Sequence, residues 1–433
     1  MTKKGIVWFK TDLRLHDNET LIRAIEENDA IIPVYCFDIQ EFKKVNQKNQ
    51  NHGAFRLKFL FESITDLDQN LRKIGSGLIF LMGNPLVEIP KIAFNYNARK
   101  VYAKREVAIF EKQLDIKMEA ELWKHKCFFE PFSTSTLYHA TDLPFALKDI
   151  PDVFTTFRKR TEKETKIRDV FEKPKRIVSP TIPVLKLPTF FELGLTENIS
   201  DERGVLPFYG GENKALERLN FYLFDSHLIK KYKETRNGLL GGDYSSKLSP
   251  WLANGCVSAR KIYAEVKKFE AEFGANDSTY WLIFELIWRD YFRFIFKKHQ
   301  HKLFTFNGIS NQNKAVPKVD AQKIENWKLG KTGVDFVDAN MNELRLTGFM
   351  SNRGRQNVAS YFIHELNQDW RIGARYFEEQ LIDYDASSNW GNWAYLAGVG
   401  NDPRSGRQFN IEKQAKEYDA TNAYQNLWLK AKV

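Results

Sequence analysis

The sequence has few cysteines, and none of them is spaced for pairing. Its 433 residues include only Cys36, Cys127 and Cys256, which lie far apart and in no Cys-x-x-Cys or Cys/His arrangement. Neither a disulfide framework nor a zinc site is therefore indicated. Scattered free cysteines are typical of proteins in reducing surroundings, so we expect a cytoplasmic or other reducing intracellular compartment.

Long apolar runs are also missing. No stretch approaches the roughly 18 consecutive apolar residues that a membrane helix needs. Asp12 and Arg14 interrupt the short apolar run near the N-terminus before a signal peptide could form. The acids Asp383 and Asp385 lack the glycine and terminal glutamate of a calcium loop. We therefore expect no membrane span and no metal site.

Positive charge and aromatic side chains are abundant. The formal net charge is +10, and 14% of the residues are aromatic. A basic protein of this size commonly meets phosphate, nucleic acid or an anionic membrane, and charge alone selects none of them. The aromatic residues by themselves favour the plainer explanation, a large helical core.

The chain divides into two halves with different periodicity. Residues 1–130 alternate β-branched runs with amphipathic stretches, and the expected strands are GIVWF, AIIPVYCF, GLIFLMG and KVYAKRE. We predict an α/β doubly wound domain with a parallel sheet for 1–130, an extended proline-rich linker for 131–205, and an all-α domain for 206–433. No G-x-G-x-x-G follows the first strand, so a standard dinucleotide site is not expected there.

Polar clusters occur at three places in the helical half. Glu285, Trp288 and Arg289 share one helical face, which suits either an interhelical ion pair or a cavity wall. Arg355 and Asp383 suit either a buried salt bridge or contacts to a polar heterocycle. The loop GGDYSSKLS predicts either a simple turn before a helix or a phosphate cradle. Together the clusters indicate one large ligand with phosphate, polar edges and a flat ring system.

The stretch NWGNWAYLAGVGNDPRSGRQFN, residues 389–410, combines indoles, short amides and glycines. Its glycine content argues against a helix or a long strand, so we expect a loop. Such a loop could surround a flat ring system with amide side chains.

Long ordered runs of the chain resemble the photolyase/cryptochrome family, and most closely its DASH branch. They include VWFKTDLRLHDNETL, YKETRNGLLGGDYSSKLSPWLANGCVSAR, FELIWRDYFRF, LIDYDASSNWGNWAYLAGVGNDPR and FNIEKQAKEYD, and the resemblance covers essentially the whole chain. It implies a flavoprotein that holds a folded FAD inside the helical domain, beside a cavity for a flipped-out pyrimidine dimer. It also implies a blue-light-dependent lyase of the deoxyribodipyrimidine photo-lyase type, in which reduced FAD donates an electron to a cyclobutane dimer.

The resemblance assigns roles to residues by their position. It implies that FAD is held by Tyr232, Ser245, Ser246, Lys247, Leu248, Ser249, Arg289, Arg355, Asp383, Asp385 and Asn389. It implies contacts to the lesion or to DNA for Arg236, Glu285, Trp288, Asn352, Arg353, Gln356, Tyr395 and Gln414. Glu106 stands where the family has an acid that binds 5,10-methenyltetrahydrofolate, a light-harvesting second cofactor.

Electron transfer is the point at which the chain departs from the family pattern. Trp393 and Trp370 match two members of the family's tryptophan chain, whereas Pro317 stands at the position of the third. Proline cannot relay an electron. We predict that photoreduction of the flavin still occurs, and that the electron either returns quickly or leaves through another Tyr or Trp.

The resemblance also implies a partner. Tyr395 and Gln356 make the lesion pocket more polar than in many repair photolyases, as in the DASH branch, whose repair favours single-stranded DNA. We expect a monomer that acts on single-stranded DNA with pyrimidine dimers, with RNA as a further partner. The alternatives are a blue-light photoreceptor that signals without catalysis and a DNA-binding regulator.

Overall fold

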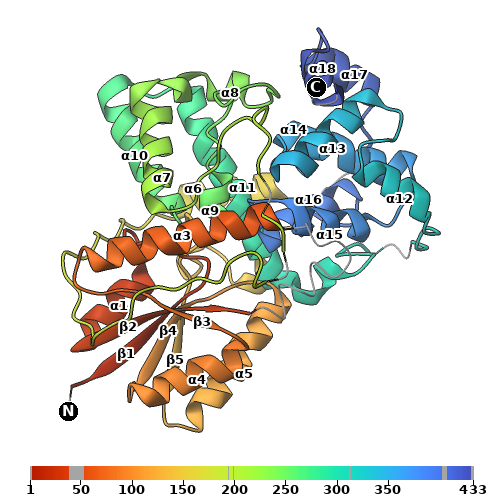
Figure 1. The fold of residues 1–433 in the computed structure, drawn as a ribbon. Coiled ribbons are helices and arrows are strands. Elements are labelled where there is room, and N and C mark those ends of the chain that lie inside the picture. Colours follow the sequence, from red (N-terminus) through yellow and green to blue (C-terminus); the bar gives the residue numbers. More distant parts are fainter. Residues whose placement is uncertain are drawn as a thin grey trace.

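Figure 1 shows the protein as a computed structural model, which describes residues 2–38, 53–193, 195–197, 199–311, 314–401 and 407–430. A layered α/β half and a helical half lie side by side, with helix α3 (Ala54–Arg72) running between them. The N-terminus lies at the far end of the sheet from the helical half, and the C-terminal helices lie at the opposite end of the molecule. This arrangement confirms the predicted fold class.

The described residues of the first half form one parallel sheet of five strands. The strands are β1 (Lys4–Phe9), β2 (Ala30–Phe37), β3 (Ile79–Met82), β4 (Lys100–Lys104) and β5 (Phe128–Phe132), in the order β3-β2-β1-β4-β5. In register, Ile6 of β1 pairs with Ile32 of β2 and with Val101 of β4. The direction of winding reverses between β1 and β4, which makes the carboxyl ends of these strands the topological switch point.

Helices cover both faces of the sheet. They are α1 (Glu19–Glu27) and α3 on one face, and α4 (Pro85–Asn95) and α5 (Ile109–Trp123) on the other. Val7 and Phe9 join the core beneath α1 and α3, whereas Ile6 and Trp8 join the core beneath α4 and α5. This alternation is what a strand buried on both faces requires. Asn18 caps helix α1, because its side chain accepts a hydrogen bond from the Leu21 amide.

Four of the five strands coincide with the predicted runs, and β5 was not predicted. Its sequence FFEPF contains Glu130 and Pro131, which weaken the apolar pattern of a buried strand. Proline is tolerated there because β5 lies at the edge of the sheet and pairs only with β4. The strand ends at Phe132, two residues beyond the predicted domain boundary at 130.

Residues 131–205 were predicted to form an extended linker. Part of this connecting segment is helical instead. Helix α6 (Phe154–Glu164) lies within it and packs against the long helix α11 (Asp277–His299). Phe154 and Phe157 are buried at this contact. The linker prediction was therefore wrong for α6, because its charged and threonine residues outnumber its few buried side chains. The boundaries at 130 and 205 themselves stay predictions.

The second half is almost entirely helical. Besides α11, its helices are α7 (Glu212–Asn220), α8 (Tyr232–Thr235), α9 (Ser249–Ala253), α10 (Ala259–Phe273), α12 (Ala321–Lys328), α13 (Asp335–Thr347), α14 (Asn352–Ser360), α15 (Trp370–Gln380), α16 (Ala386–Leu396), α17 (Ile411–Tyr418) and α18 (Ala423–Leu429). The stretch 355–381 is not one helix but is divided between α14, which continues into a π-helical turn (Tyr361–Glu365), and α15. Asp369 caps the second piece by accepting a hydrogen bond from the Arg371 amide.

The loop prediction for residues 389–410 was wrong for its first part. Residues up to Leu396 belong to α16, which Asp385 caps by accepting a hydrogen bond from the Ser388 amide. Gly391 does not form a turn. It allows α16 to pack closely against α11, because a Cβ atom there would lie 2.4 Å from the ring of Phe292 on α11. Residues 402–406 of the predicted loop lie outside the described part of the chain.

The two halves share one continuous apolar core, which contains residues from β1 through to α18. They approach each other closely at Gly255, whose backbone has a φ of +70°. A Cβ atom at this glycine would lie 2.0 Å from the Thr11 carbonyl oxygen. Arg14 crosses the same contact and donates a hydrogen bond to the Gly255 carbonyl over 2.9 Å.

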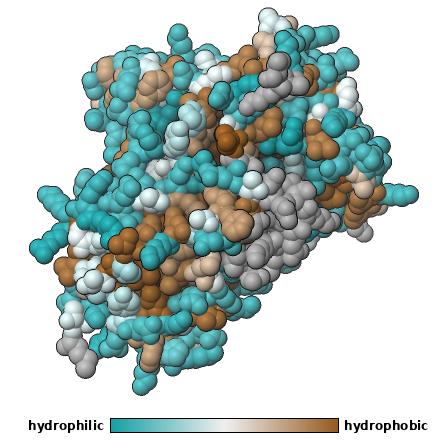
Figure 2. Space-filling model, viewed as in Figure 1, coloured by the Kyte–Doolittle hydropathy of each residue, from teal (hydrophilic) through white to brown (hydrophobic). Residues whose placement is uncertain are grey.

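Hydrophilic side chains cover much of the visible face of the molecule (Figure 2). Among the described helices, none is both long and apolar enough to cross a membrane.

Substitution of Gly255 tests this contact between the halves. Gly255→Ala imposes both a left-handed backbone and a collision with the Thr11 backbone, so we expect the free energy of unfolding to fall by about 2–5 kcal/mol. Gly241→Ala is the matched control, because Gly241 has a φ of +77° and nothing within 4 Å of the added carbon. Its cost is backbone strain alone, about 1–2 kcal/mol in urea unfolding. Equal losses for the two variants would contradict the close contact.

Candidate functional site

A cavity of two adjoining lobes lies inside the helical half. The first lobe, about 710 Å³, is lined by Tyr232, Arg236, Tyr244, Ser245, Ser246, Lys247, Leu248, Ser249, Glu285, Phe349, Met350 and Ser351. The second, about 520 Å³, is lined by Gln356, Ala359, Phe377, Leu381, Tyr384, Asp385, Ser388, Asn389, Asn392, Trp393 and Leu396. Asn352, Arg355 and Asp383 line both lobes. The fold therefore brings three sequence-distant clusters around one space.

The loop 245–249 is held from behind by Arg218 of α7. This guanidinium donates hydrogen bonds to the carbonyls of Ser246 at 3.0 Å, Ser245 at 3.2 Å and Gly242 at 2.8 Å. Lys247 in the loop has a φ of +60°, a conformation that is strained for any residue with a Cβ atom. Backbone strain of this kind persists only where the surroundings impose it, and it is common at ligand sites.

Lys247 carries a buried amino group that has no hydrogen-bond partner in the described part of the protein. The residue is 3% exposed, and Nζ lies over the Tyr244 ring. Burial lowers the pKa of Lys247 well below its ordinary value, since an isolated ammonium is costly in a dry interior. An anionic ligand such as a pyrophosphate would remove that cost. The amino group thus fits a ligand that carries phosphate in the first lobe.

Arg355 and Asp383 form an ion pair where the two lobes meet. Arg355 Nη2 lies 2.8 Å from Asp383 Oδ2, and Arg355 Nε donates to the Met350 carbonyl over 2.9 Å. The other carboxylate oxygen of Asp383 is buried without a partner among the described residues. The predicted salt bridge therefore forms, whereas contact of this pair with a polar heterocycle stays a prediction, which the unpartnered oxygen would suit.

Asp385 and Asn389 reach the second lobe from the start of α16. Burial alone would raise the pKa of Asp385, but Arg293 and Arg289 outweigh burial and hold it below its ordinary value. The carboxylate is therefore charged, and Arg293 Nη1 lies 2.7 Å from Oδ2. Asn389 is 8% exposed, and its amide nitrogen donates to the Ala374 carbonyl over 2.9 Å. Short polar side chains thus line this lobe from a rigid helix.

Trp393 forms the inner wall of the second lobe. Its ring packs edge-on against Phe377 and fills the space over Gly373, where a Cβ atom would lie 2.2 Å from the indole. Trp370 is 2% exposed and its ring centroid lies 5.7 Å from that of Trp390. Pro317 lies in the segment before α12 and contributes no aromatic ring to this group.

Glu285, which the sequence predicts to contact the lesion, lines the first lobe. Arg236 Nη1 lies 2.9 Å from its carboxylate, and both side chains line the lobe. Burial raises the pKa of Glu285, and Arg236 opposes that rise. Asn352 and Gln356, predicted for the same role, line the cavity as well.

Other residues predicted for the site lie elsewhere, and their roles stay predictions. The Trp288 ring stacks on Phe154 of α6, with centroids 3.6 Å apart and an interplanar angle of 14°. Arg289 donates to the carbonyls of Ser135 at 2.5 Å and Leu252 at 3.3 Å. The remaining three contact other side chains: Arg353 lies over Tyr418, Arg407 lies over Tyr395, and Gln414 accepts from Asn357.

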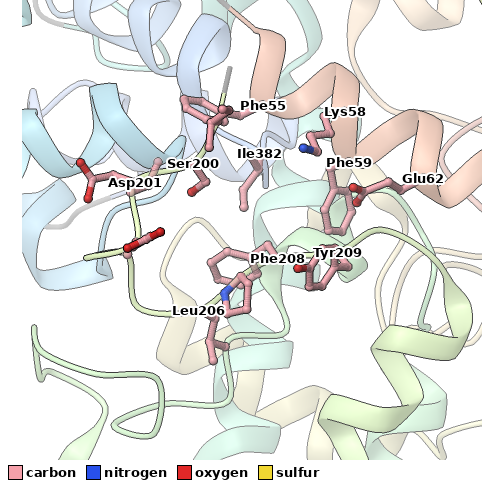
Figure 3. A pocket seen from close by; sticks show the side chains of 15 residues that line it. Phe55, Lys58, Phe59, Glu62, Ser200, Asp201, Leu206, Phe208, Tyr209 and Ile382 are labelled. Atoms are coloured by element: carbon pink, nitrogen blue, oxygen red, sulfur yellow. The ribbon is translucent and has the colours of Figure 1, made fainter. Parts of the chain in front are cut away.

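A separate hollow lies between α3 and the connecting segment (Figure 3). Phe55 and Phe59 of α3 line it together with Phe208 and Tyr209. Phe208 packs on Phe349, with centroids 4.9 Å apart, and Phe349 also lines the first lobe. One aromatic pair thus divides the two spaces, and none of the predicted site residues lines the hollow in Figure 3.

Comparisons with known proteins agree with this geometry. The family model for the FAD binding domain of DNA photolyase matches residues 281–431, and the model for DNA photolyase matches residues 5–177. Cryptochrome DASH of Synechocystis sp. is 48% identical over 430 residues, which cover 98% of this chain and 87% of the relative. The chain belongs to the cryptochrome DASH family.

Solved structures support the same assignment. A crystal structure of the Synechocystis sp. cryptochrome matches with a TM-score of 0.95 and 47% identity, covering 99% of this chain and 89% of the other. A bacterial class III photolyase from Agrobacterium tumefaciens matches with a TM-score of 0.83 and 26% identity, covering 99% and 87%. The photolyase-like fold and an FAD-binding helical domain follow for this family member.

FAD suits the groups that the cavity leaves unsatisfied. Its pyrophosphate matches the buried amino group of Lys247, and its ring system offers N–H and C=O groups to Asp383 and Asn389. The described residues contain no group of three or more His, Cys, Asp or Glu side chains placed to hold a metal.

Glu106 does not fit the predicted role of a folate ligand. It is 7% exposed, and Thr11 and Lys104 engage one of its oxygens while Arg293 engages the other. Both oxygens thus have partners within the protein, and Glu106 lines neither lobe of the cavity. We therefore derive no light-harvesting step through this residue.

Sequence reasoning missed a buried acid behind the first lobe. Glu343 of α13 is 1% exposed, and the Tyr424 hydroxyl lies 2.6 Å from its Oε2 and 3.1 Å from Asn340 Oδ1. One hydroxyl proton cannot serve both acceptors, whereas a protonated Glu343 can donate to Tyr424 while Tyr424 donates to Asn340. Burial raises the pKa of Glu343 to about 7, which fits this chain of hydrogen bonds. Nothing in the periodicity of α13 distinguishes Glu343 from an exposed glutamate.

The raised pKa of Glu343 predicts a pH dependence of stability. The folded-state value of about 7 exceeds the ordinary one, so the stabilisation is complete below about pH 4.5 and is lost as the pH rises through 7. We expect the free energy of unfolding of the flavin-free protein to fall between pH 5 and 8 more steeply than that of Glu343→Gln, in which an amide donates in place of the acid. Parallel curves for the two proteins would show that Glu343 is charged throughout.

Proposed function

We propose that this chain is a light-driven lyase that splits cyclobutane pyrimidine dimers, preferentially in single-stranded DNA. The observation that carries the proposal is that Glu285 lines the same lobe as the phosphate-binding loop around Lys247. A group able to hydrogen-bond the edge of a pyrimidine therefore lies beside the space for the cofactor. When bound, FAD supplies the blue-light absorption and the electron for the dimer.

The side chains of the site hold and orient the cofactor and the lesion, and each does so from a fixed position. Lys247 and the loop 245–249 bind the phosphates, with Arg218 fixing the loop from behind. Arg355 and Asp383 hold the polar edge of the flat ring, and Asn389 faces it from α16. Because burial raises the pKa of Glu285, a proton is held on this acid more readily than on an exposed glutamate, and it can donate to a pyrimidine carbonyl.

The preference for single strands is supported by the surroundings of Trp288. Phe154 already covers one face of this indole and Tyr395 packs edge-on against it, while the polar side chain of Gln356 lines the second lobe. Stacking on aromatic side chains contributes about 1–3 kcal/mol per base. Extraction of a base from a duplex costs a few kcal/mol, so a pocket with limited stacking acts best on an unpaired lesion.

The partners and surroundings proposed for the protein follow from its charge and cysteines. A net charge of +10 favours a phosphate backbone, so DNA is the proposed partner and RNA a further one. We propose a monomer. All three cysteines are buried and unpaired, which suits a cytoplasmic or other reducing compartment.

Loss of thymine dimers under blue light tests the proposal. We expect faster loss in single-stranded than in duplex oligonucleotides. We also expect Glu285→Gln to reduce the rate by up to about tenfold at equal FAD content, because one buried hydrogen bond to the lesion is weakened. Glu265→Gln is the control, since Glu265 pairs with Lys261 on α10, outside the cavity lining.

Two outcomes would redirect the proposal. No light-dependent loss in either substrate would favour a blue-light photoreceptor or a DNA-binding regulator. Equal rates on single-stranded and duplex DNA would retain the lyase and remove the substrate preference.

A further inference from the structure

The topological switch point of the sheet is filled by a side chain from the helical half. Open parallel sheets usually bind ligands outside the carboxyl ends of their strands at this point. Here the segment after β1 supplies Thr11, and β4 and the residues that follow it supply Lys104 and Glu106. Arg293 of α11 enters between them and is 3% exposed. A position that commonly serves a ligand thus serves the contact between halves.

Arg293 joins two carboxylates that are far apart in the sequence. Its Nη2 lies 2.8 Å from Glu106 Oε2, and its Nη1 lies 2.7 Å from Asp385 Oδ2. Lys104 Nζ lies 2.8 Å from Glu106 Oε1, and the Thr11 hydroxyl donates to the same oxygen. The result is a continuous chain of charges from the sheet to the second lobe of the cavity, in the order Lys104, Glu106, Arg293 and Asp385.

Glu106, Arg293 and Asp385 depend on their neighbours for their charge. Burial alone would raise the pKa of Glu106, but Lys104 and Arg293 outweigh burial and lower it to about 2. Burial likewise opposes the charge of Arg293, and Asp385 and Glu106 restore it. Loss of either carboxylate would leave a buried arginine with half its partners, which is costly in a dry interior.

Asp385 is where this chain reaches the cavity. It lines the second lobe, and it caps α16, the helix that carries Asn389 and Trp393. Its position is therefore fixed from two sides, by the Ser388 amide and by Arg293.

We propose that Glu106 is a positioning residue for the flavin site, acting through Arg293 on Asp385 to set the electrostatic potential of the second lobe. This inference rests on the FAD site proposed above and is independent of dimer repair. The first half of the chain thereby influences the flavin, although none of its described residues lines either lobe of the cavity. Glu106 contributes this charge from the place where a folate ligand was expected.

The flavin midpoint potential is the direct readout. Glu106→Gln keeps the shape of the side chain and removes one negative charge from the network, so the second lobe becomes more positive and reduction to the anionic flavin becomes easier. We expect a positive shift of the midpoint potential in spectroelectrochemical titration of the FAD-loaded protein. Glu106→Asp keeps the charge and should restore the wild-type potential in full or in large part.

Glu212→Gln is the matched control. Glu212 is also a buried carboxylate that joins the two halves, with bonds to His16 and to the amides of Leu15 and His16, and it does not contact Arg293. Both Gln variants should lower the thermal unfolding midpoint, and only Glu106→Gln should shift the potential. A purely structural role for Glu106 predicts equal behaviour of the two variants.

A double variant tests the route through Arg293. In an Arg293→Gln background, removal of the Glu106 charge should shift the potential by less than it does in the wild type. An unchanged potential in Glu106→Gln, or a shift of equal size in Glu212→Gln, would overturn the inference. If Glu106→Gln does not fold, a wild-type potential in Glu106→Asp combined with a normal potential in Arg293→Gln would also overturn it. Absence of dimer repair in the wild type leaves this test intact.

Discussion

Charges that are buried in the helical half can persist only beside opposite charges or hydrogen-bond partners, and this constraint places the site. Arg293 meets it inside the protein, between Glu106 and Asp385. Lys247 and the open oxygen of Asp383 do not meet it within the described residues. The cavity therefore suits a ligand with phosphate at one end and hydrogen-bonding groups at the other, and FAD, the cofactor of the matching family model, is such a ligand.

The fold could be predicted wherever the buried residues of a segment dominate its sequence pattern. Strands β1 to β4 are runs of β-branched and aromatic residues between helices, so their pattern is unambiguous. Strand β5 and helix α6 were missed because charges, proline and threonine dominate their sequences while only a few side chains are buried. Helix α16 was predicted as a loop because Gly391 suggests a turn, whereas it is there to accommodate the Phe292 ring. Local sequence cannot show that neighbour.

The sequence predicted best those site residues that line the cavity. The loop around Lys247, the Arg355–Asp383 pair and Asn389 converge as expected from the family resemblance. Sequence does not show which partner a long side chain selects. Trp288 stacks on Phe154 of the unpredicted helix α6, and Glu106 pairs with an arginine nearly two hundred residues away. Arg293 could have been noticed, because it lies one helical turn beyond Arg289 on the same face of α11.

Titration of the flavin-free protein with FAD tests the central claim most directly. One buried dinucleotide site predicts a stoichiometry of one FAD per chain, quenching of the flavin fluorescence on binding, and weaker binding in Lys247→Met, which removes the buried amino group. The absence of saturable FAD binding by folded protein, or binding that is unaffected by Lys247→Met, would contradict the account.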